Sequence, residues 1–369
     1  MNIDGVLGHL RRLVAFDTQN PPRYLDAAAP IFSYISKSLG AGFEIDVTDH
    51  GLGRVSMLAV RGKPSLLFNV HLDTVPISAA ARFPALEMTC DGDRVYGRGV
   101  CDIKGAAACL LEIAAATADP MAVLFTSDEE GASGCCIHEF VASDKTDAFT
   151  QVLVAEPTDC LAVLSHRGYL SVKGRFSGVA GHSSEPRALG DNALHKLSSW
   201  VAAAVKQAGQ LENQGRRPCF NVGEINGGIK SNVIADEAHL HWSARLSPGD
   251  SNEDFMATMT GLEHGQSADW DIPFSGPPLP VAGMDVANAQ IFVEKHGIET
   301  GPLVSFWTEA SLFARAGIPA MVLGPGNIAQ AHAVDEWVSI GQLEKALGIY
   351  AKLIADQAAN QAADQVEEV

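Results

Sequence analysis

Short, mostly apolar runs alternate with helix-forming segments in the first half of the chain, and this alternation restricts the choice of fold. Runs at 65–70, 121–126 and 151–155 have the length of buried strands, and strong helix formers fill 104–116. A further apolar run lies at 319–323. Strands that alternate with helices favour parallel pairing beneath a layer of helices. We therefore expect an α/β fold with a mostly parallel central sheet.

The middle of the chain has a different pattern. Residues 169–175 and 238–245 alternate with period two, and a helix is predicted over 192–210. A length of 369 residues is also more than one core comfortably fills, and a proline-rich stretch at 273–280 suits a linker. These features predict an inserted α+β domain. The expected boundaries are 1–164 for the first part of the larger domain, 165–275 for the insertion and 276–369 for the second part.

The charge balance and the N-terminus narrow the class of protein. A net charge of −18 argues against binding nucleic acid or an anionic membrane through bulk electrostatics. No apolar run approaches the ~20 residues of a membrane helix. Residues 1–17 lack the order of a signal peptide and predict an amphipathic helix that starts at Asp4. The seven cysteines include no C-x-x-C pair, so we expect a reduced, cytoplasmic protein without a disulfide framework.

Imidazole and carboxylate side chains stand just after the predicted strands and just before one predicted helix. They are His71, Asp73, Glu129, Glu130, Glu156 and His332 after strands, and Asp102 before the helix. Because ligands bind where the carboxyl ends of parallel strands share one edge, we expect these side chains to converge. Nitrogen and oxygen ligands of this mixture suit zinc, and also cobalt or manganese.

Each of these residues also has an ordinary interpretation. Residues 128–130 could form an acidic turn, and Asp102 could cap the helix that follows. His239 and His241 could chelate a metal from one strand, although an exposed strand face is the better interpretation. The chain contains no G-x-S-x-G, Walker A or G-x-G-x-x-G motif that would favour another chemistry. Four sites after strands on one edge favour a metal centre over coincidence.

Eight segments extend this pattern along nearly the whole chain. They are FDTQNPP (16–22), HLDTVP (71–76), GRGVCDIKG (97–105), SDEEGASG (127–134), AEPT (155–158), GVAGHSSEP (178–186), NGGIKSNVIA (226–235) and LGPGNIAQAH (323–332). In sequence and order they resemble the co-catalytic zinc deacylases and metallopeptidases, a family that includes acetylornithine deacetylase, succinyl-diaminopimelate desuccinylase, aminoacylase and glutamate carboxypeptidase.

The resemblance implies a role for each residue at the sheet edge. It implies one or two Zn²⁺ ions per subunit, with Co²⁺ able to substitute. The implied ligands are His71 and Glu156 for one metal, Glu130 and His332 for the other, and Asp102 as a bridge. Asp73 resembles the acid that orients the first histidine, and Glu129 resembles the general base.

The resemblance also assigns residues in the inserted domain. His182 matches a histidine that reaches the active site of the partner subunit, which implies a homodimer whose inserted domain forms the interface and a lid. Asn232 and Arg245 match positions that bind the substrate carboxylate, a task for which the guanidinium fork is suited. Without the resemblance, His182 would be interpreted as an exposed loop histidine and Arg245 as a surface charge.

Segments 305–310 and 323–336 most resemble the acetylornithine deacetylase branch. The combination of FNVHLDTVP (68–76), VCDIKGAAA (100–108) and FWTEASLF (306–313) resembles the acetylcitrulline-specific variant of that branch more closely still. Acetylornithine is placed first because it is the commoner activity of the branch. We expect removal of acetate from N-acetyl-L-ornithine in arginine biosynthesis. N-acetyl-L-citrulline stays open as an alternative, since no motif distinguishes an amine from a ureido group at the end of the side chain. Another acyl-amino-acid deacylase or a dipeptidase would use the same chemistry. A catalytically silent metal-binding homologue is the alternative of a different class, and the presence of Glu129 argues against it.

Overall fold

The computed structural model describes residues 1–22, 24–131 and 135–367, with side chains to residue 359, and it forms two compact units. Unit 1 contains Met1–Leu164, Val286–Pro302 and Thr308–Val369, and unit 2 contains Ser165–Asp285 and Leu303–Trp307. Residues 132–134, the end of the predicted SDEEGASG segment, lie outside the described residues.

The second boundary of the insertion differs from the prediction of 275/276. Unit 2 continues to Asp285 and takes up Leu303–Trp307. In this region the backbone of His166 exchanges hydrogen bonds with Leu279, and Arg167 N donates to Val304 O. Such main-chain pairing leaves no periodic pattern of side chains, so the proline-rich stretch looked like a linker although part of it is paired.

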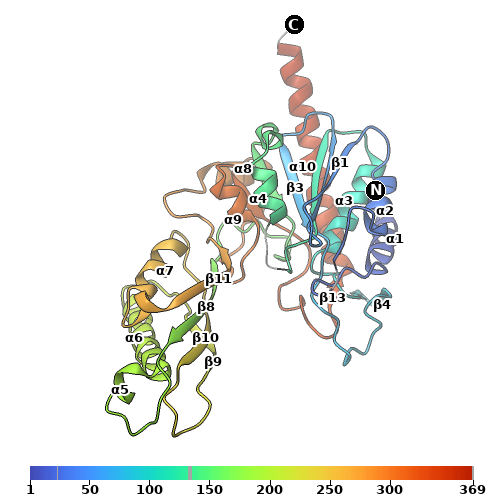
Figure 1. Cartoon of the computed structure of the whole chain (residues 1–369). Coiled ribbons are helices and arrows are strands. Elements are labelled where there is room, and N and C mark those ends of the chain that lie inside the picture. The colour runs from blue at the N-terminus through green and yellow to red at the C-terminus, as the bar shows by residue number, and fades with distance from the viewer. Residues whose placement is uncertain (23, 132–134, 368–369) are drawn as a thin grey trace. The chain divides into compact units, whose positions relative to one another are not determined.

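Unit 1 is built on a mixed sheet whose larger part is parallel (Figure 1). Its order is β1 (Glu44–Asp49), β2 (Val55–Arg61), β6 (Met121–Thr126), β3 (Leu66–His71), β7 (Gln151–Val154) and β12 (Ala320–Val322). The last four strands run parallel, whereas β1 and β2 pair antiparallel at one edge. The four predicted strands are these parallel ones to within one residue, and the expected fold class is confirmed.

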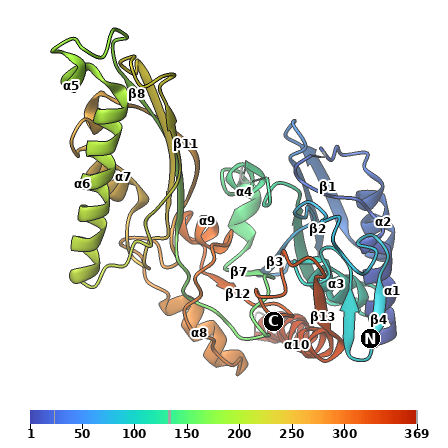
Figure 2. The same cartoon turned by 90° about the horizontal axis from the view of Figure 1, so that it is seen from below.

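Helices cover both faces of this sheet (Figure 2). On one side lie α1 (Ile3–Val14), α2 (Pro30–Ser38), α3 (Lys104–Ala116) and α10 (Ile340–Glu367), and on the other α4 (Cys135–Val141) and α9 (Ala310–Arg315); α8 spans Ala287–His296. The Asn2 side chain accepts a hydrogen bond from Gly5 N, so Asn2 caps α1 in place of the predicted Asp4. Within the described residues, no helix has both the length and the apolar character to cross a membrane.

A small three-stranded sheet in unit 1 joins segments that are distant in sequence. Its order is β13 (Trp337–Ser339), β5 (Arg94–Tyr96) and β4 (Thr89–Asp91). The antiparallel pairing of β13 with β5 places the residues just before Trp337 beside those just after Tyr96. The backbone N–H of Gly97 accordingly donates to Glu336 O at 3.2 Å.

Unit 2 is a four-stranded antiparallel sheet with helices packed on one face. Its order is β11 (Asp269–Gly276), β8 (Tyr169–Ser177), β10 (Glu237–Ala244) and β9 (Asn221–Gly227), and its helices are α5 (Ala188–Asp191), α6 (Ala193–Asn213) and α7 (Asn252–Thr260). Ala238, Leu240 and Trp242 of β10 are buried in the core shared with α6 and α7. The period-two pattern therefore identified an inner and an outer face of this strand correctly.

Candidate metal centre

Imidazole and carboxylate groups converge at the carboxyl edge of the unit 1 sheet. One group comprises His71, Asp102 and Glu156, and a second comprises Asp102, Glu130 and His332. Within each group the potential ligand atoms lie within 4.8 Å of one another. Asp102 belongs to both groups. The segments expected to meet at this edge do meet. They follow strands β3, β6, β7 and β12 or precede helix α3, and they are far apart in the sequence.

His71 is the last residue of β3 and is 1% exposed. Its Nδ1 lies 2.9 Å from the backbone oxygen of Asp73. A carbonyl oxygen can only accept, so Nδ1 carries the proton and the lone pair of Nε2 is available to a metal. That Nε2 lies 3.0 Å from Asp102 Oδ1 and 3.4 Å from Glu156 Oε1.

Asp73 contacts two neighbouring segments through different atoms. Its carbonyl binds the His71 ring, whereas its carboxylate Oδ1 is 3.6 Å from His71 Nδ1. The other oxygen, Oδ2, accepts from Glu130 N at 2.9 Å and from Asn20 Nδ2 at 3.0 Å. The expected support of the histidine ring therefore comes from the main chain of Asp73. Burial raises the pKa of the Asp73 carboxyl to about 6.

Asp102 lies between the two candidate histidines. It does not cap α3, whose N-cap is Ile103 without a side-chain hydrogen bond. Its Oδ1 faces His71, and its Oδ2 lies 3.1 Å from His332 Nε2, which is also 3.1 Å from Glu130 Oε1. His332 has a φ of 58°, a left-handed conformation that is uncommon outside glycine and is concentrated at functional sites.

The electrostatics of this cluster favour a bound cation. Hydrogen bonds to Asp102 and Glu130 raise the pKa of His332 to about 10. Burial disfavours the charged form of His71, but Glu156 and Asp102 outweigh it and raise the pKa of this histidine well above its usual value. Burial and the charge of Asp102 raise the pKa of Glu156 to about 7. Divalent cations that accept nitrogen and oxygen ligands, such as Zn²⁺, Co²⁺ or Mn²⁺, fit this donor set.

Glu129 lies beside the same cluster. One of its oxygens is within 4.8 Å of a His71 ring nitrogen and of a Glu130 oxygen. Burial raises the pKa of Glu129 well above its usual range, and the charges of Glu130, Glu156 and Glu309 add to this effect. A carboxyl group with a raised pKa is a stronger base once ionised, as proton transfer near neutral pH requires.

Sequence reasoning missed two residues near this edge. Glu309, the N-cap of α9, is 1% exposed, and its Oε1 has no hydrogen-bond partner among the residues that the structure describes. Burial raises the pKa of Glu309 well above its usual value, and the charges of Asp128, Asp73 and Glu156 add to this effect. Asn20 binds the Asp73 carboxylate and donates to Ser127 O at 3.2 Å. Both residues lie in segments that carried the family resemblance, and that position was the only signal available for them.

The predicted site residues of the insertion lie in unit 2. His182 and Asn232 belong to two loops that pair, since His182 bridges to Val233 and Ser183 N donates to Asn232 O at 3.1 Å. The Nδ1 atom of His182 lies 2.7 Å from Ser184 Oγ. The Arg245 guanidinium stacks 4.1 Å from the centre of the Tyr169 ring. The functions assigned to these three residues stay predictions.

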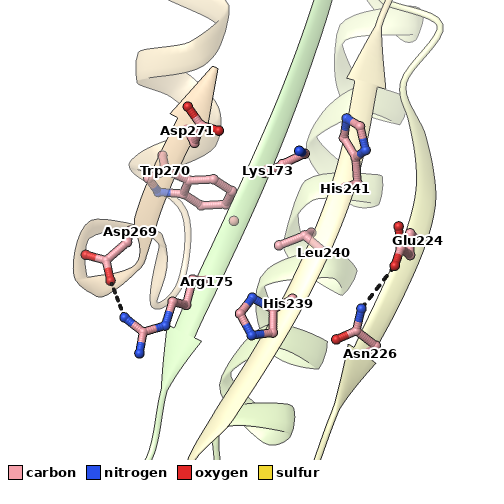
Figure 3. A pocket seen from close by; sticks show the side chains of 11 residues that line it. Lys173, Arg175, Glu224, Asn226, His239, Leu240, His241, Asp269, Trp270 and Asp271 are labelled. Carbon is pink, nitrogen blue, oxygen red and sulfur yellow. Dashed lines mark hydrogen bonds and ion pairs between the residues drawn. The ribbon is translucent and has the colours of Figure 1, made fainter. Parts of the chain in front are cut away.

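A hollow of about 530 Å³ lies on the outer face of the unit 2 sheet (Figure 3). Two cross-strand rows line it: Asp269, Arg175, His239 and Asn226 in one, and Asp271, Lys173, His241 and Glu224 in the other. Arg175 pairs with Asp269 and with Glu237. In the described part of the chain, neither histidine belongs to a group of three potential ligands. This face is best explained as a solvated surface with cross-strand ion pairs.

Comparisons with known proteins agree with this geometry. The sequence pattern of peptidase family M20/M25/M40 matches residues 67–356 of this chain. N-acetyl-L-citrulline deacetylase of Xanthomonas campestris pv. campestris is 44% identical over 356 residues, which cover 92% of this chain and 94% of that protein. Acetylornithine deacetylase of Vibrio vulnificus is 31% identical over 338 residues, 84% of this chain and 86% of that protein.

A solved structure is similar in fold alone. It is the Bacillus subtilis YXEP protein, described as a dinuclear metal binding peptidase of the M20 family. Its sequence is 14% identical, the TM-score is 0.65, and the match covers 97% of this chain and 98% of that one.

Proposed function

The chain belongs to peptidase family M20/M25/M40, and on that premise we propose that it removes acetate from an Nα-acetyl amino acid by metal-dependent hydrolysis of the amide bond. The observation that carries this proposal is the pair of ligand groups that share Asp102 at the edge of the sheet. The activities named for the two relatives, both deacetylases of amino acids, support the same reaction class.

The proposed substrate is N-acetyl-L-citrulline, with N-acetyl-L-ornithine as the second candidate. The sequence alone left these two open. The identity of 44% to an acetylcitrulline deacetylase, against 31% to an acetylornithine deacetylase, favours the ureido substrate. Either reaction would place the protein in arginine biosynthesis, and a cytoplasmic location fits that role.

Two divalent ions are proposed as cofactors, with zinc as the first choice and cobalt as a substitute. His71 and Glu156 would hold one ion, Glu130 and His332 the other, and Asp102 both. Three carboxylates neutralise most, but not all, of the charge of two such ions. When bound, the ions would polarise the amide carbonyl and make water a stronger acid.

The chain's own residues supply the proton transfers and the substrate contacts. The Glu129 carboxylate takes a proton from the attacking water and gives it to the departing amine nitrogen. Asp73 holds the His71 ring and the Glu130 backbone in place. Arg245 and Asn232 bind the substrate carboxylate. His182 acts in the site of the partner subunit of a homodimer, in which unit 2 forms the interface and a lid.

The test measures acetate release from N-acetyl-L-citrulline and N-acetyl-L-ornithine side by side. Chelated protein is compared with protein reloaded with Zn²⁺ or Co²⁺, and a dipeptide serves as a third substrate. We expect metal-dependent release with acetylcitrulline preferred. Cleavage of the dipeptide alone would move the function to a peptidase. No turnover of any substrate, with metal demonstrably bound, would favour the silent homologue.

A further inference from the structure

Glu336 is a buried carboxylate that binds the segment carrying Asp102. It is 3% exposed and precedes β13. Its Oε1 accepts from Cys101 N at 2.9 Å and from Asp102 N at 3.0 Å. Its Oε2 accepts from Gly99 N at 2.9 Å and from Arg98 Nη1 at 2.8 Å. One side chain thus satisfies three backbone N–H groups and one guanidinium.

The segment that Glu336 binds contains a tight turn at Gly99. Gly99 has a φ of 83°, and a Cβ at this position would lie 2.8 Å from Thr74 Cγ2, so the turn requires glycine. Arg98 is 4% exposed, and it also donates to Ala333 O at 3.2 Å. Because the N–H groups that face Glu336 are buried, losing their acceptor would leave them unsatisfied.

The same contacts join two parts of the candidate metal centre. Residues 98–102 end at Asp102, whose carboxylate lies between His71 and His332. Residues 333–336 directly follow His332. Glu336 and Arg98 therefore join the segment that presents the shared carboxylate to the segment that presents the exposed histidine. The N–H of Asp102 itself is one of the groups held.

We propose that Glu336 is a positioning residue that sets the Asp102 carboxylate between the two ligand groups. This inference rests on the proposed metal centre, because a shared ligand has meaning only if both groups bind metal. Residues around a metal site that orient its ligands alter metal affinity or activity by about 10–100-fold when replaced. The competing explanation is a purely structural clamp, in which the Arg98–Glu336 ion pair matters only for stability.

The experiment titrates metal-depleted protein with Co²⁺ and follows the visible absorption of the bound ion together with calorimetry. In Glu336→Gln, whichever way the amide points, its NH₂ group faces N–H donors. We expect about 10–100-fold weaker Co²⁺ binding and a changed Co²⁺ spectrum. Asp335→Asn is the matched control, since Asp335 lies in the same segment but pairs with the exposed Arg82, and its Co²⁺ affinity should match that of the unchanged chain.

A double variant separates positioning from stability. In Glu336→Gln/Arg98→Met the unpaired buried charge is gone, so the melting temperature should rise above that of Glu336→Gln while Co²⁺ binding stays weak. This variant also serves if Glu336→Gln does not fold. A rise in melting temperature accompanied by recovery of Co²⁺ affinity, or Co²⁺ binding by Glu336→Gln equal to that of the unchanged chain, would overturn the inference. Failure of the unchanged chain to bind Co²⁺ would instead overturn the proposed metal centre, and this inference with it.

Discussion

The carboxylate of Asp73 accepts the backbone N–H of Glu130 at 2.9 Å. The carbonyl of the same residue accepts from the His71 ring at 2.9 Å. Asp73 therefore supports candidate ligands that follow two neighbouring parallel strands, β3 and β6, through two different groups. Its influence on the centre should extend beyond the orientation of one histidine.

Replacing Asp73 with Ala should weaken metal binding about 10–100-fold, because the variant keeps the carbonyl that binds His71 but loses the acceptor for Glu130 N. Asp73→Asn retains one oxygen acceptor, so its metal affinity should decrease less than that of Asp73→Ala. Metal content after dialysis against a competing chelator measures both variants. Full metal retention by Asp73→Ala would show that the Glu130 contact is dispensable.

Replacing Glu129 with Ala should reduce kcat by about 10²-fold or more and leave metal content nearly unchanged, because the proton acceptor is lost while the proposed ligands stay. The test measures the rate of acetate release and the metal content of the same preparation. If the variant remained active, the proposed mechanism would be wrong. Loss of metal together with activity would instead make Glu129 a ligand, which its position beside His71 and Glu130 permits.

The metal-depleted protein should lose stability as the pH rises. The folded chain raises the pKa of Glu156 from 4.5 to about 7 and that of His332 from 6.5 to about 10. Between these pKa values the folded state binds protons that the unfolded state has released. The contribution of each group to the free energy of unfolding is therefore complete at low pH and is lost as the pH rises. Thermal unfolding of chelated protein between pH 5 and 10 tests this. A melting temperature that rises over that interval would contradict it.

The two histidines of the cluster, His71 and His332, should make metal binding release protons, because both have a raised pKa. A divalent ion must displace the protons on His71 and His332, so metal uptake near pH 7 should release protons, and affinity should increase with pH. Calorimetric titration in buffers of different ionisation enthalpy measures the number released. Uptake without proton release would mean that the metal binds elsewhere.

Replacing His182 with Ala should reduce turnover strongly without removing metal, if this histidine acts in the partner's site. Mixing His182→Ala with Glu129→Ala protein should then restore activity, since one site of each mixed dimer would contain both intact residues. Differently tagged subunits allow the mixed dimers to be purified. The absence of recovery in verified mixed dimers would argue that His182 does not act across the interface.

Prediction from sequence succeeded where side-chain pattern and backbone position are directly linked. The strands that end at His71, Thr126 and Val154 were predictable because each is a short apolar run, and parallel strands then bring the residues that follow to one edge. The exposed side of β10 followed from its period of two in the same way.

The rest depended on contacts that have no sequence period. Glu336 and Glu309 are carboxylates that a sequence places on the surface, but pairing across long separations buries them. Isolated β-bridges of His166 with Leu279 and with Val304 place residues beyond 275 in the insertion, and the composition of these residues does not predict such pairing. The sequence likewise does not show that the Asp73 carbonyl binds the His71 ring while its carboxylate binds the Glu130 N–H, because both contacts depend on the folded geometry.

The insertion of unit 2 within unit 1 gives the centre an order of assembly during synthesis. His71, Asp102, Glu130 and Glu156 leave the ribosome first, and five strands of the sheet can pair before β12 is added beside β7. His332 follows only after all of unit 2 has been made. At about 5–20 residues per second this separation corresponds to roughly 10–35 s. Throughout that interval the nascent chain carries a cluster of acids with a single histidine, and the full set of ligands exists only once His332 has been made.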